Sequence, residues 1–302
     1  MTQTTILTNI LKLHFAHWHL SRIKCLSYII TGLFKVKTVN LTEIATTFPG
    51  RAEIESNYRR LQRFFQHVTF DSTLIAQLVV SFLPYTTYTL VLDRTNWMLG
   101  GFPINFLVLS VVHQGIAFPI LWTFLPKKGN SNTKERIELL NRFIAHFGTL
   151  KIDCLLADRE FIGKEWFGYL KRHHIRFHIR IKRDMNISRT NGNLSPASNF
   201  FRSLPLGTYC TLYGPRLICG HLLWVTGMRL PDGEYVIVVS DSQSDNVMTE
   251  YKRRWKVEVL FEALKSRGFN FSEDHLTFRL SILMSPLASA IVPSKQQGLI
   301  WR

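Results

Sequence analysis

Two apolar, β-prone runs that each end in an aspartate place the strongest limit on the fold of this chain. The run TYTLVLD ends at Asp93, and KIDCLLAD ends at Asp158. Between them lie INFLVLSVV, GIAFPILWTFL and the amphipathic RIELLNRFIAHF, while GKEWFGYLKRHH and IRFHIRIK follow the second aspartate. Strands that alternate with helices predict an α/β sheet whose strand ends open into one crevice. We therefore expect Asp93 and Asp158 to lie close together.

The N-terminal residues 1–80 differ, because their pattern predicts helices only. The segments LTEIATTF and EIESNYRRLQRFFQ are separated by Pro49-Gly50, which is a turn signal. Two short helices around such a turn resemble a DNA-binding helix-turn-helix. A plain helical bundle with a solvated basic face explains the pattern equally well. The second helix carries the aromatic and basic residues Tyr58, Arg59, Arg60 and Arg63.

Residues 184–245 have a third character. Asn, Ser, Pro and Gly separate short β-prone runs such as GTYCTLYG, HLLWVTGMRL and EYVIVVSD. This predicts a β-rich insertion in the α/β core. The expected organisation is a helical region at 1–80, a first core part at 85–183, the insertion at 184–245, and a returning core helix with a short tail at 246–302.

The charge of the chain indicates its partner. Its 302 residues include 37 Lys and Arg against 21 Asp and Glu, a formal charge of +16. Such an excess favours a polyanion, first of all nucleic acid. A membrane surface is the alternative, but no stretch of about 18 apolar residues could span a bilayer.

The N-terminus and the cysteines bear on where the protein works. The first residues lack the features of a secretory signal, and the four cysteines are scattered with no C-x-x-C pair. We expect a cytoplasmic protein whose cysteines are small buried hydrophobic residues rather than zinc ligands or disulfide partners.

A stripe of four polar residues follows the insertion. Tyr251, Arg254, Glu258 and Lys265 are separated by three, four and seven residues, so they share one face of a helix. Such a face can hold metal and phosphate together. Arg254 and Lys265 suit phosphate oxygens, and Tyr251 can hydrogen-bond to DNA or stack on it.

Three carboxylates thus stand at positions that can converge. With Asp93 and Asp158, Glu258 would form a hard-oxygen site suited to Mg²⁺. Two such ions can activate an attacking oxygen and stabilise the leaving oxygen of a phosphodiester. Taken singly, Asp93 is better explained by a pair with Arg94 and Asp158 by a helix cap. Taken together, the three favour a metal site.

Three motifs carry a family resemblance. LVLDRTNW around Asp93, LLADREFIGKEWF around Asp158 and Y-x-x-R-x-x-x-E-x-x-x-x-x-x-K from Tyr251 to Lys265 resemble the signature regions of insertion-sequence-family-four DDE transposases. The resemblance implies an RNase H-like core that contains a β-rich insertion. It also implies an enzyme that cuts the ends of its element, through a hairpin intermediate, and joins them to target DNA. It further implies a homodimer on two terminal inverted repeats, in a bacterial cytoplasm, associated with the nucleoid when bound to DNA.

The resemblance also implies roles for single residues. Asp93, Asp158 and Glu258 would bind Mg²⁺, with Mn²⁺ as a substitute. The residues expected to contact DNA near the cleaved end are Tyr251, Arg254 and Lys265.

Two further residues have competing explanations. Arg159 follows the second aspartate as in the family motif and could reach DNA phosphate, but a salt bridge to Glu160 or Glu165 fits as well. Trp224 could stack on a flipped base at the DNA end, whereas a tryptophan packed in a β-sheet core is the more common arrangement.

The C-terminal sequence TFRLSILMSPLASAIVPSKQQGLIWR departs from the family pattern. We expect a truncated or altered C-terminus here. The sequence therefore leaves two alternatives to an active transposase: a catalytically inactive DNA-binding remnant or inhibitor, and an RNase H-like DNA nuclease with another role.

Overall fold

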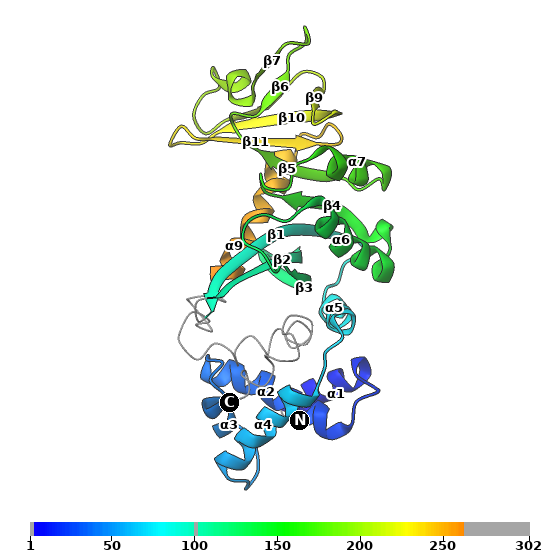
Figure 1. Ribbon diagram of the computed structural model, residues 1–302, viewed down its shortest axis with the longest axis vertical. Coiled ribbons are helices and arrows are strands. Elements are labelled where there is room, and N and C mark those ends of the chain that lie inside the picture. Colours follow the sequence, from blue (N-terminus) through cyan, green and yellow to red (C-terminus); the bar gives the residue numbers. More distant parts are fainter. Residues whose placement is uncertain (1–2, 100–101, 263–302) are drawn as a thin grey trace. The chain divides into compact units, whose positions relative to one another are not determined.

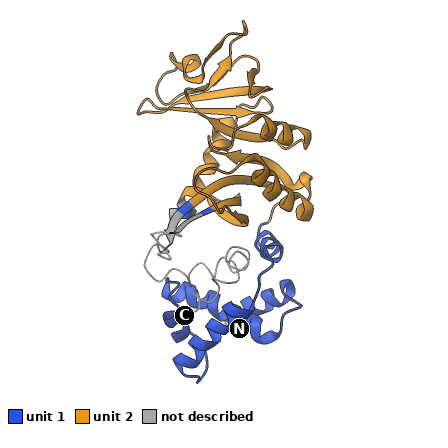
Figure 2. Ribbon diagram, in the orientation of Figure 1, with its two compact units in different colours: residues 1–83, 96–105, 260–302 blue, residues 84–95, 106–259 orange. Residues whose placement is uncertain are grey.

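The computed structural model describes residues 3–99 and 102–262 of the chain. Contacts within the chain divide it into two compact units, which Figure 2 colours separately. Unit 1 comprises residues 1–83, 96–105 and 260–302, and unit 2 comprises residues 84–95 and 106–259.

Helices make up the N-terminal part of unit 1 (Figure 1). Their apolar faces share a core whose most buried members include Leu11, Phe15, Ile29, Ile44 and Leu61, each at most 1% exposed. The helices are α1 (Gln3–His14), α2 (Leu20–Val36), α3 (Leu41–Thr46), α4 (Ile54–His67) and α5 (Ser72–Ser81).

The α3–α4 pair is the segment for which the sequence predicts a helix-turn-helix. Asn40 caps α3, since its Oδ1 accepts a hydrogen bond of 3.0 Å from the Thr42 N–H. On α4, the Arg60 guanidinium lies over the rings of Tyr28 and Phe48, at 5.5 and 5.8 Å from the ring centroids. The Arg60 side chain therefore packs on α2 and on the residues that follow α3, within unit 1. DNA binding by these helices stays a prediction.

A mixed sheet runs through unit 2 (Figure 1) and confirms the predicted α/β class. Within the described residues, nine strands join it in the order β3-β2-β1-β4-β5-β11-β10-β8, and β9 pairs with β10. The β1–β4 and β4–β5 pairs are parallel, whereas β2–β3, β5–β11 and β10–β11 are antiparallel. The central strands are β1 (Tyr88–Leu99), β2 (Phe102–His113), β3 (Ile116–Phe124), β4 (Ile152–Ala157) and β5 (Phe177–Ile181).

The residues of the predicted insertion extend this sheet. The strands β11 (Tyr235–Ser240) and β10 (His221–Arg229) add to the free edge of β5, and β8 (Tyr209–Thr211) follows. A separate two-stranded sheet consists of β6 (Asn186–Ser188) and β7 (Leu194–Pro196), followed by the 3-10 helix η2 (Ala197–Phe201). The short strand β9 spans Arg216–Ile218. The β-prone runs therefore continue the central sheet.

Helices cover both faces of the sheet, and β5 shows how. On one face Phe177 stacks on Phe167 of α7 (Lys164–Arg172), with ring centroids 5.5 Å apart. The next residue, His178, points to the other face and contacts Glu250 of α8 (Val247–Tyr251). On the α7 side lies α6 (Thr133–Phe147), which starts with a capping box between Asn132 and Glu135.

After α8 the chain continues through the 3-10 helix η3 (Lys252–Trp255) into α9 (Lys256–Glu262). Among the described residues, no helix has both the length and the apolar character needed to cross a membrane.

A glycine in the middle of β10 allows close packing. A Cβ added at Gly227 would lie 2.5 Å from the ring of Phe201, which is itself 1% exposed. We expect Gly227→Ala to lower the free energy of unfolding by about 1–3 kcal/mol, because the added methyl group overpacks this contact. Urea unfolding of the full chain measures the change.

Phe201→Ala provides the control for this prediction. In that background the ring is gone, so Gly227→Ala should cost much less, and the double-mutant cycle should show coupling. Equal costs in both backgrounds would contradict the proposed packing.

Candidate active site

The register of two parallel strands brings the two aspartates together. Leu92 of β1 pairs with Ala157 of β4, so Asp93 and Asp158 follow one matched pair of residues. β1 itself continues past Asp93 to Leu99, because it goes on to pair with β2. The sequence had indicated that this strand ends at Asp93. The two carboxylates interact electrostatically, as expected for neighbouring strand positions.

Asp93 is well anchored. Its Oδ1 accepts a hydrogen bond of 2.8 Å from the Arg94 backbone N–H, and its Oδ2 lies 3.2 Å from Nη1 of Arg254. Asp158 is different, since its buried Oδ1 has no hydrogen-bond partner among the described residues. A buried carboxylate oxygen without a partner is costly unless something else satisfies it.

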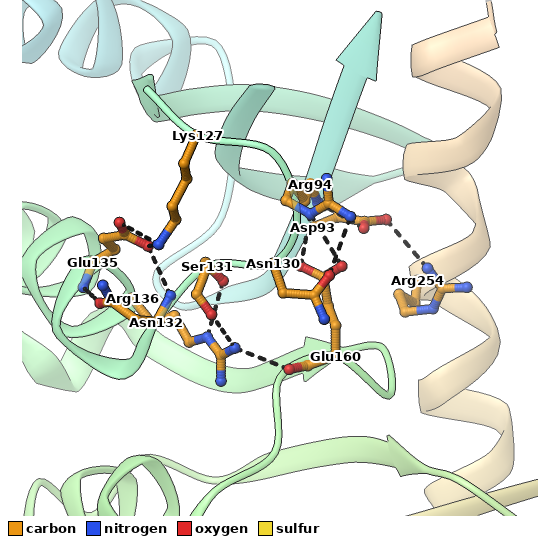
Figure 3. Close-up of polar contacts among 10 residues, drawn as sticks. All are labelled: Asp93, Arg94, Lys127, Asn130, Ser131, Asn132, Glu135, Arg136, Glu160 and Arg254. Atoms are coloured by element: carbon orange, nitrogen blue, oxygen red, sulfur yellow. Dashed lines mark hydrogen bonds and ion pairs between the residues drawn. The ribbon is translucent and has the colours of Figure 1, made fainter. Parts of the chain in front are cut away.

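Arg254 links Asp93 to the third acid. Its Nη2 donates a hydrogen bond of 2.6 Å to Oε1 of Glu258, one turn further along the helical segment. The Arg254 side chain is 3% exposed, against 14% for Asp93 and 59% for Glu258. The close-up in Figure 3 shows Arg254 reaching from its helix toward Asp93. One guanidinium therefore bridges the strand and the helix that carry two of the three predicted ligands.

Tyr251 lies deeper than the sequence suggests. It is 1% exposed and packs with Val236, Val238, Val247 and Met248. Its hydroxyl has no hydrogen-bond partner among the described residues. The Arg254 guanidinium carbon lies 5.8 Å from the centre of its ring. In this structure the phenol faces the interior of unit 2.

Burial shapes the protonation of the site. Burial raises the pKa of Asp93 from 3.8 to about 6, although Arg254 and the Arg94 N–H act to lower it; Asp158 and Glu160 raise it further. Burial works against the charge of Arg254, but Tyr251, Asp93 and Asp158 act in the opposite direction and raise its pKa on balance. Arg254 therefore stays charged.

The donor set fits a divalent cation. When ionised, the three carboxylates carry three negative charges, and Arg254 offsets one of them. Carboxylate oxygens are the ligands that hard divalent ions prefer. The unpartnered Asp158 Oδ1 is one donor that such an ion would satisfy. Among the described residues, the oxygens of Asp93, Asp158 and Glu258 do not all lie within 4.8 Å of one another, so the three acids would have to draw closer to hold one ion together.

A second network, drawn in Figure 3, holds the segments that bear the two aspartates. Nε of Arg94 lies 3.1 Å from both carboxylate oxygens of Glu160. The buried Arg136 donates hydrogen bonds of 2.9 Å to the Glu160 carbonyl and 3.0 Å to the Ser131 hydroxyl. The 3.4 Å contact from Arg94 to Asn130 closes the network. The sequence indicated Arg94 and Glu160 only as partners of Asp93 and Arg159, because no local spacing signals a contact between positions as far apart as Arg94 and Glu160.

A basic groove lies beside Asp158. It has a volume of about 510 Å³, and its positive charge exceeds its negative charge. Arg159 at its rim is exposed, and Glu160 pairs with Arg94 instead. The charged residues that line it are Arg159, Arg180, Lys182, Arg183, Asp184 and Glu234.

Two other predicted contacts lie elsewhere. Trp224 is half-buried on β10, where it pairs with Ser240 of β11. Lys265 falls outside the described residues.

Comparison with known proteins points to one family. The model of the family described as "Transposase DDE domain" matches residues 117–282. No curated protein matches the sequence significantly. Among solved structures, the piggyBac transposase synaptic complex with hairpin DNA is similar at 10% identity and a TM-score of 0.45, over 93% of this chain and 79% of that one.

The raised pKa of Asp93 predicts a pH dependence of stability. Between its ordinary value of 3.8 and about 6, the folded chain binds a proton that the unfolded chain releases. The contribution of this group is therefore fully present below about pH 4 and is lost as the pH rises through 6. In EDTA, the free energy of unfolding should fall by about 1–3 kcal/mol over this pH range.

Asp93→Asn isolates this effect, because the variant has no group to titrate at the position. Its free energy of unfolding minus that of the wild type should rise between pH 4 and pH 7. A constant difference over that range would refute the raised pKa.

Proposed function

Since this chain belongs to the family of transposases with a DDE domain, we propose that it is the transposase of an insertion sequence and that Asp93, Asp158 and Glu258 are its catalytic metal ligands. DDE transposase domains act with divalent metal ions. For this chain we propose Mg²⁺, with Mn²⁺ as a substitute. The assignment to insertion-sequence family four rests on the three sequence motifs around these residues.

One observation carries the proposal: the three acids belong to one connected arrangement. The Leu92–Ala157 register aligns the two aspartates, and Arg254 joins Asp93 to Glu258. These residues come from three segments that are far apart in the sequence. A link from Arg254 to two of the three acids supports the proposal more strongly than any one strand-end acid does.

The residues of the chain have separable tasks in this proposal. A divalent metal, when bound, supplies activation of the attacking oxygen and stabilisation of the leaving oxygen. Arg254 pairs with both Asp93 and Glu258 and offsets part of their negative charge. Arg94, Glu160 and Arg136 fix the segments that present Asp93 and Asp158. Such support keeps ligand oxygens in place without rearrangement during the reaction.

We propose that DNA contacts the protein at two places. The basic groove beside Asp158 suits the phosphate backbone, with Arg159 at its rim. Near the cleaved end we propose contacts from Tyr251, Arg254 and Lys265, and stacking by Trp224. The buried positions of Tyr251 and Arg254 mean that both would have to rearrange to touch DNA.

The larger scheme follows the resemblance in sequence. We propose an RNase H-like core at 85–183 and 246–302 with the β-rich insertion at 184–245, and a helical end-binding region at 1–80. The protein would act as a homodimer on two terminal inverted repeats, and would release the element through hairpin ends before joining it to target DNA.

Removal of single acids tests the catalytic assignment. Asp93→Asn, Asp158→Asn and Glu258→Gln should each lower cleavage of DNA that bears the terminal repeats roughly 100-fold or more, because each loses a metal ligand. Gel analysis of nicks, hairpins and joined products in Mg²⁺ measures this. Binding of the repeats, measured by gel shift, should stay within about twofold of the wild type, because the fold is kept.

Glu165→Gln is the matched control, since Glu165 is an exposed acid on α7. This variant should cleave the DNA as the wild type does. Full cleavage by any of the three variants would show that the residue is misassigned. Repeat binding by the wild type without cleavage would favour the inactive DNA-binding remnant.

The basic groove makes a separate prediction. Lys182 is exposed in the groove, so Lys182→Gln should weaken DNA binding and reduce the slope of log affinity against log salt by about 1. Fluorescence anisotropy between low and moderate salt gives the slope. Lys151, exposed just before the opposite end of β4, serves as the control, and Lys151→Gln should leave the slope unchanged. Equal slopes for both variants would show that DNA does not bind in the groove.

A further inference from the structure

A cluster of three potential metal donors lies away from the three acids, on the α8 side of the sheet. It consists of Cys154 on β4, His178 on β5 and Glu250 on α8. The ligand atoms, one sulfur, one ring nitrogen and one carboxylate oxygen, all lie within 4.8 Å of one another. Three different elements thus direct donors to one point.

The strand register explains this convergence. His178 pairs with Leu156, and alternate residues of a strand point to the same face. Cys154, two residues before Leu156, therefore shares a face with His178. That face is the one covered by α8, whose Glu250 carboxylate lies 3.0 Å from Nε2 of His178.

The cluster is enclosed and its histidine is oriented. Cys154 is 1% exposed and His178 is 0% exposed. Nδ1 of His178 lies 2.7 Å from the Ser240 hydroxyl. A partner on one ring nitrogen fixes the other nitrogen toward its target, as it does around metal-bound histidines. Burial lowers the pKa of His178, although Glu250 acts in the opposite direction, which favours the neutral imidazole that a metal needs.

From this geometry we propose that Cys154, His178 and Glu250 bind a Zn²⁺ ion. Sulfur and imidazole nitrogen suit zinc, whereas Mg²⁺ prefers oxygen donors only. Three protein donors leave one position of a tetrahedral site for water. The site is distinct from the three acids, and the proposal holds whether or not they bind metal as proposed above.

Charge balance is compatible with the ion. Without metal, Arg176 pairs with Glu250, and burial keeps the Cys154 thiol protonated by raising its pKa to about 12. On binding, the thiol releases its proton to solvent, and the thiolate and carboxylate together offset the charge of Zn²⁺. Nδ1–H of His178 then donates to Ser240 while Nε2 faces the ion. Arg176, which interacts with Cys154 and Asp153 as well as with Glu250, would then share the Glu250 carboxylate with the ion and keep Asp153 as a further acidic neighbour.

The proposed zinc site lies close to the residues of the candidate active site. Glu250 directly precedes Tyr251 and lies four residues before Arg254, while β4 leads to Asp158. A zinc ion would therefore clip the helical segment that bears Arg254 to the strands behind the candidate active site. The ion would tie these segments together both in the presence and in the absence of DNA.

The metal content of the full chain tests the proposal. Protein purified without chelators should retain about one zinc per chain by inductively coupled plasma mass spectrometry. After exchange into Co²⁺, the thiolate should give a charge-transfer band in the near ultraviolet. Cys154→Ser should lose the band, whereas Cys210→Ser, at an exposed cysteine on β8, should keep it.

Two further variants separate the outcomes. Asp93→Asn should keep the zinc and the cobalt band, because it changes only the other site. If Cys154→Ser does not fold, Glu250→Gln tests the same ion through an oxygen ligand and should weaken zinc retention at least tenfold. Wild-type protein that takes up neither zinc nor cobalt would overturn the proposal and leave the cluster as a hydrogen-bond network. A cobalt band that persists in Cys154→Ser would place the ion elsewhere.

Discussion

The parallel pairing of β1 with β4 is the constraint on which the candidate site depends. In this register Leu92 faces Ala157, and a shift by one residue would turn one aspartate to the opposite face of the sheet. The apolar residues that precede each aspartate fix the register, since Leu90, Val91, Leu155 and Leu156 are fully buried. Hydrophobic packing thus holds the two aspartates on neighbouring strands although their negative charges repel each other.

That repulsion explains the cations around the site. Burying carboxylates side by side is unfavourable unless positive charge is close. Arg254 provides it for Asp93 and Glu258, and Arg94 provides it for Glu160. The remaining excess of negative charge is what a divalent ion would offset. The same balance accounts for the basic groove beside Asp158, because a polyanion can approach acids only where cations surround them.

Sequence reasoning succeeded where the signal is local. The apolar runs before Asp93 and Asp158 predicted neighbouring strands, and the alternation of strands with helices predicted the α/β class. It was less successful with contacts between distant segments. The Arg94–Glu160 pair, the addition of β11 to β5 and the Cys154–His178–Glu250 cluster each join positions more than 20 residues apart. Scattered cysteines indicated no metal site, because the spacing rules for zinc describe ligands from one loop or helix.

Tyr251 shows why even a clear helical stripe is ambiguous. Spacing identified a shared face but not what covers it, and the structure turns much of that face toward the sheet. Glu250 contacts His178, Arg254 contacts Asp93, and each lies one turn from the next. Two buried polar contacts on successive turns fix the rotation of the segment about its axis. Since Glu258 lies one turn beyond Arg254, its direction is set by the same two contacts. The buried contacts of Glu250 and Arg254 therefore orient the helical segment from which Glu258, itself 59% exposed, projects.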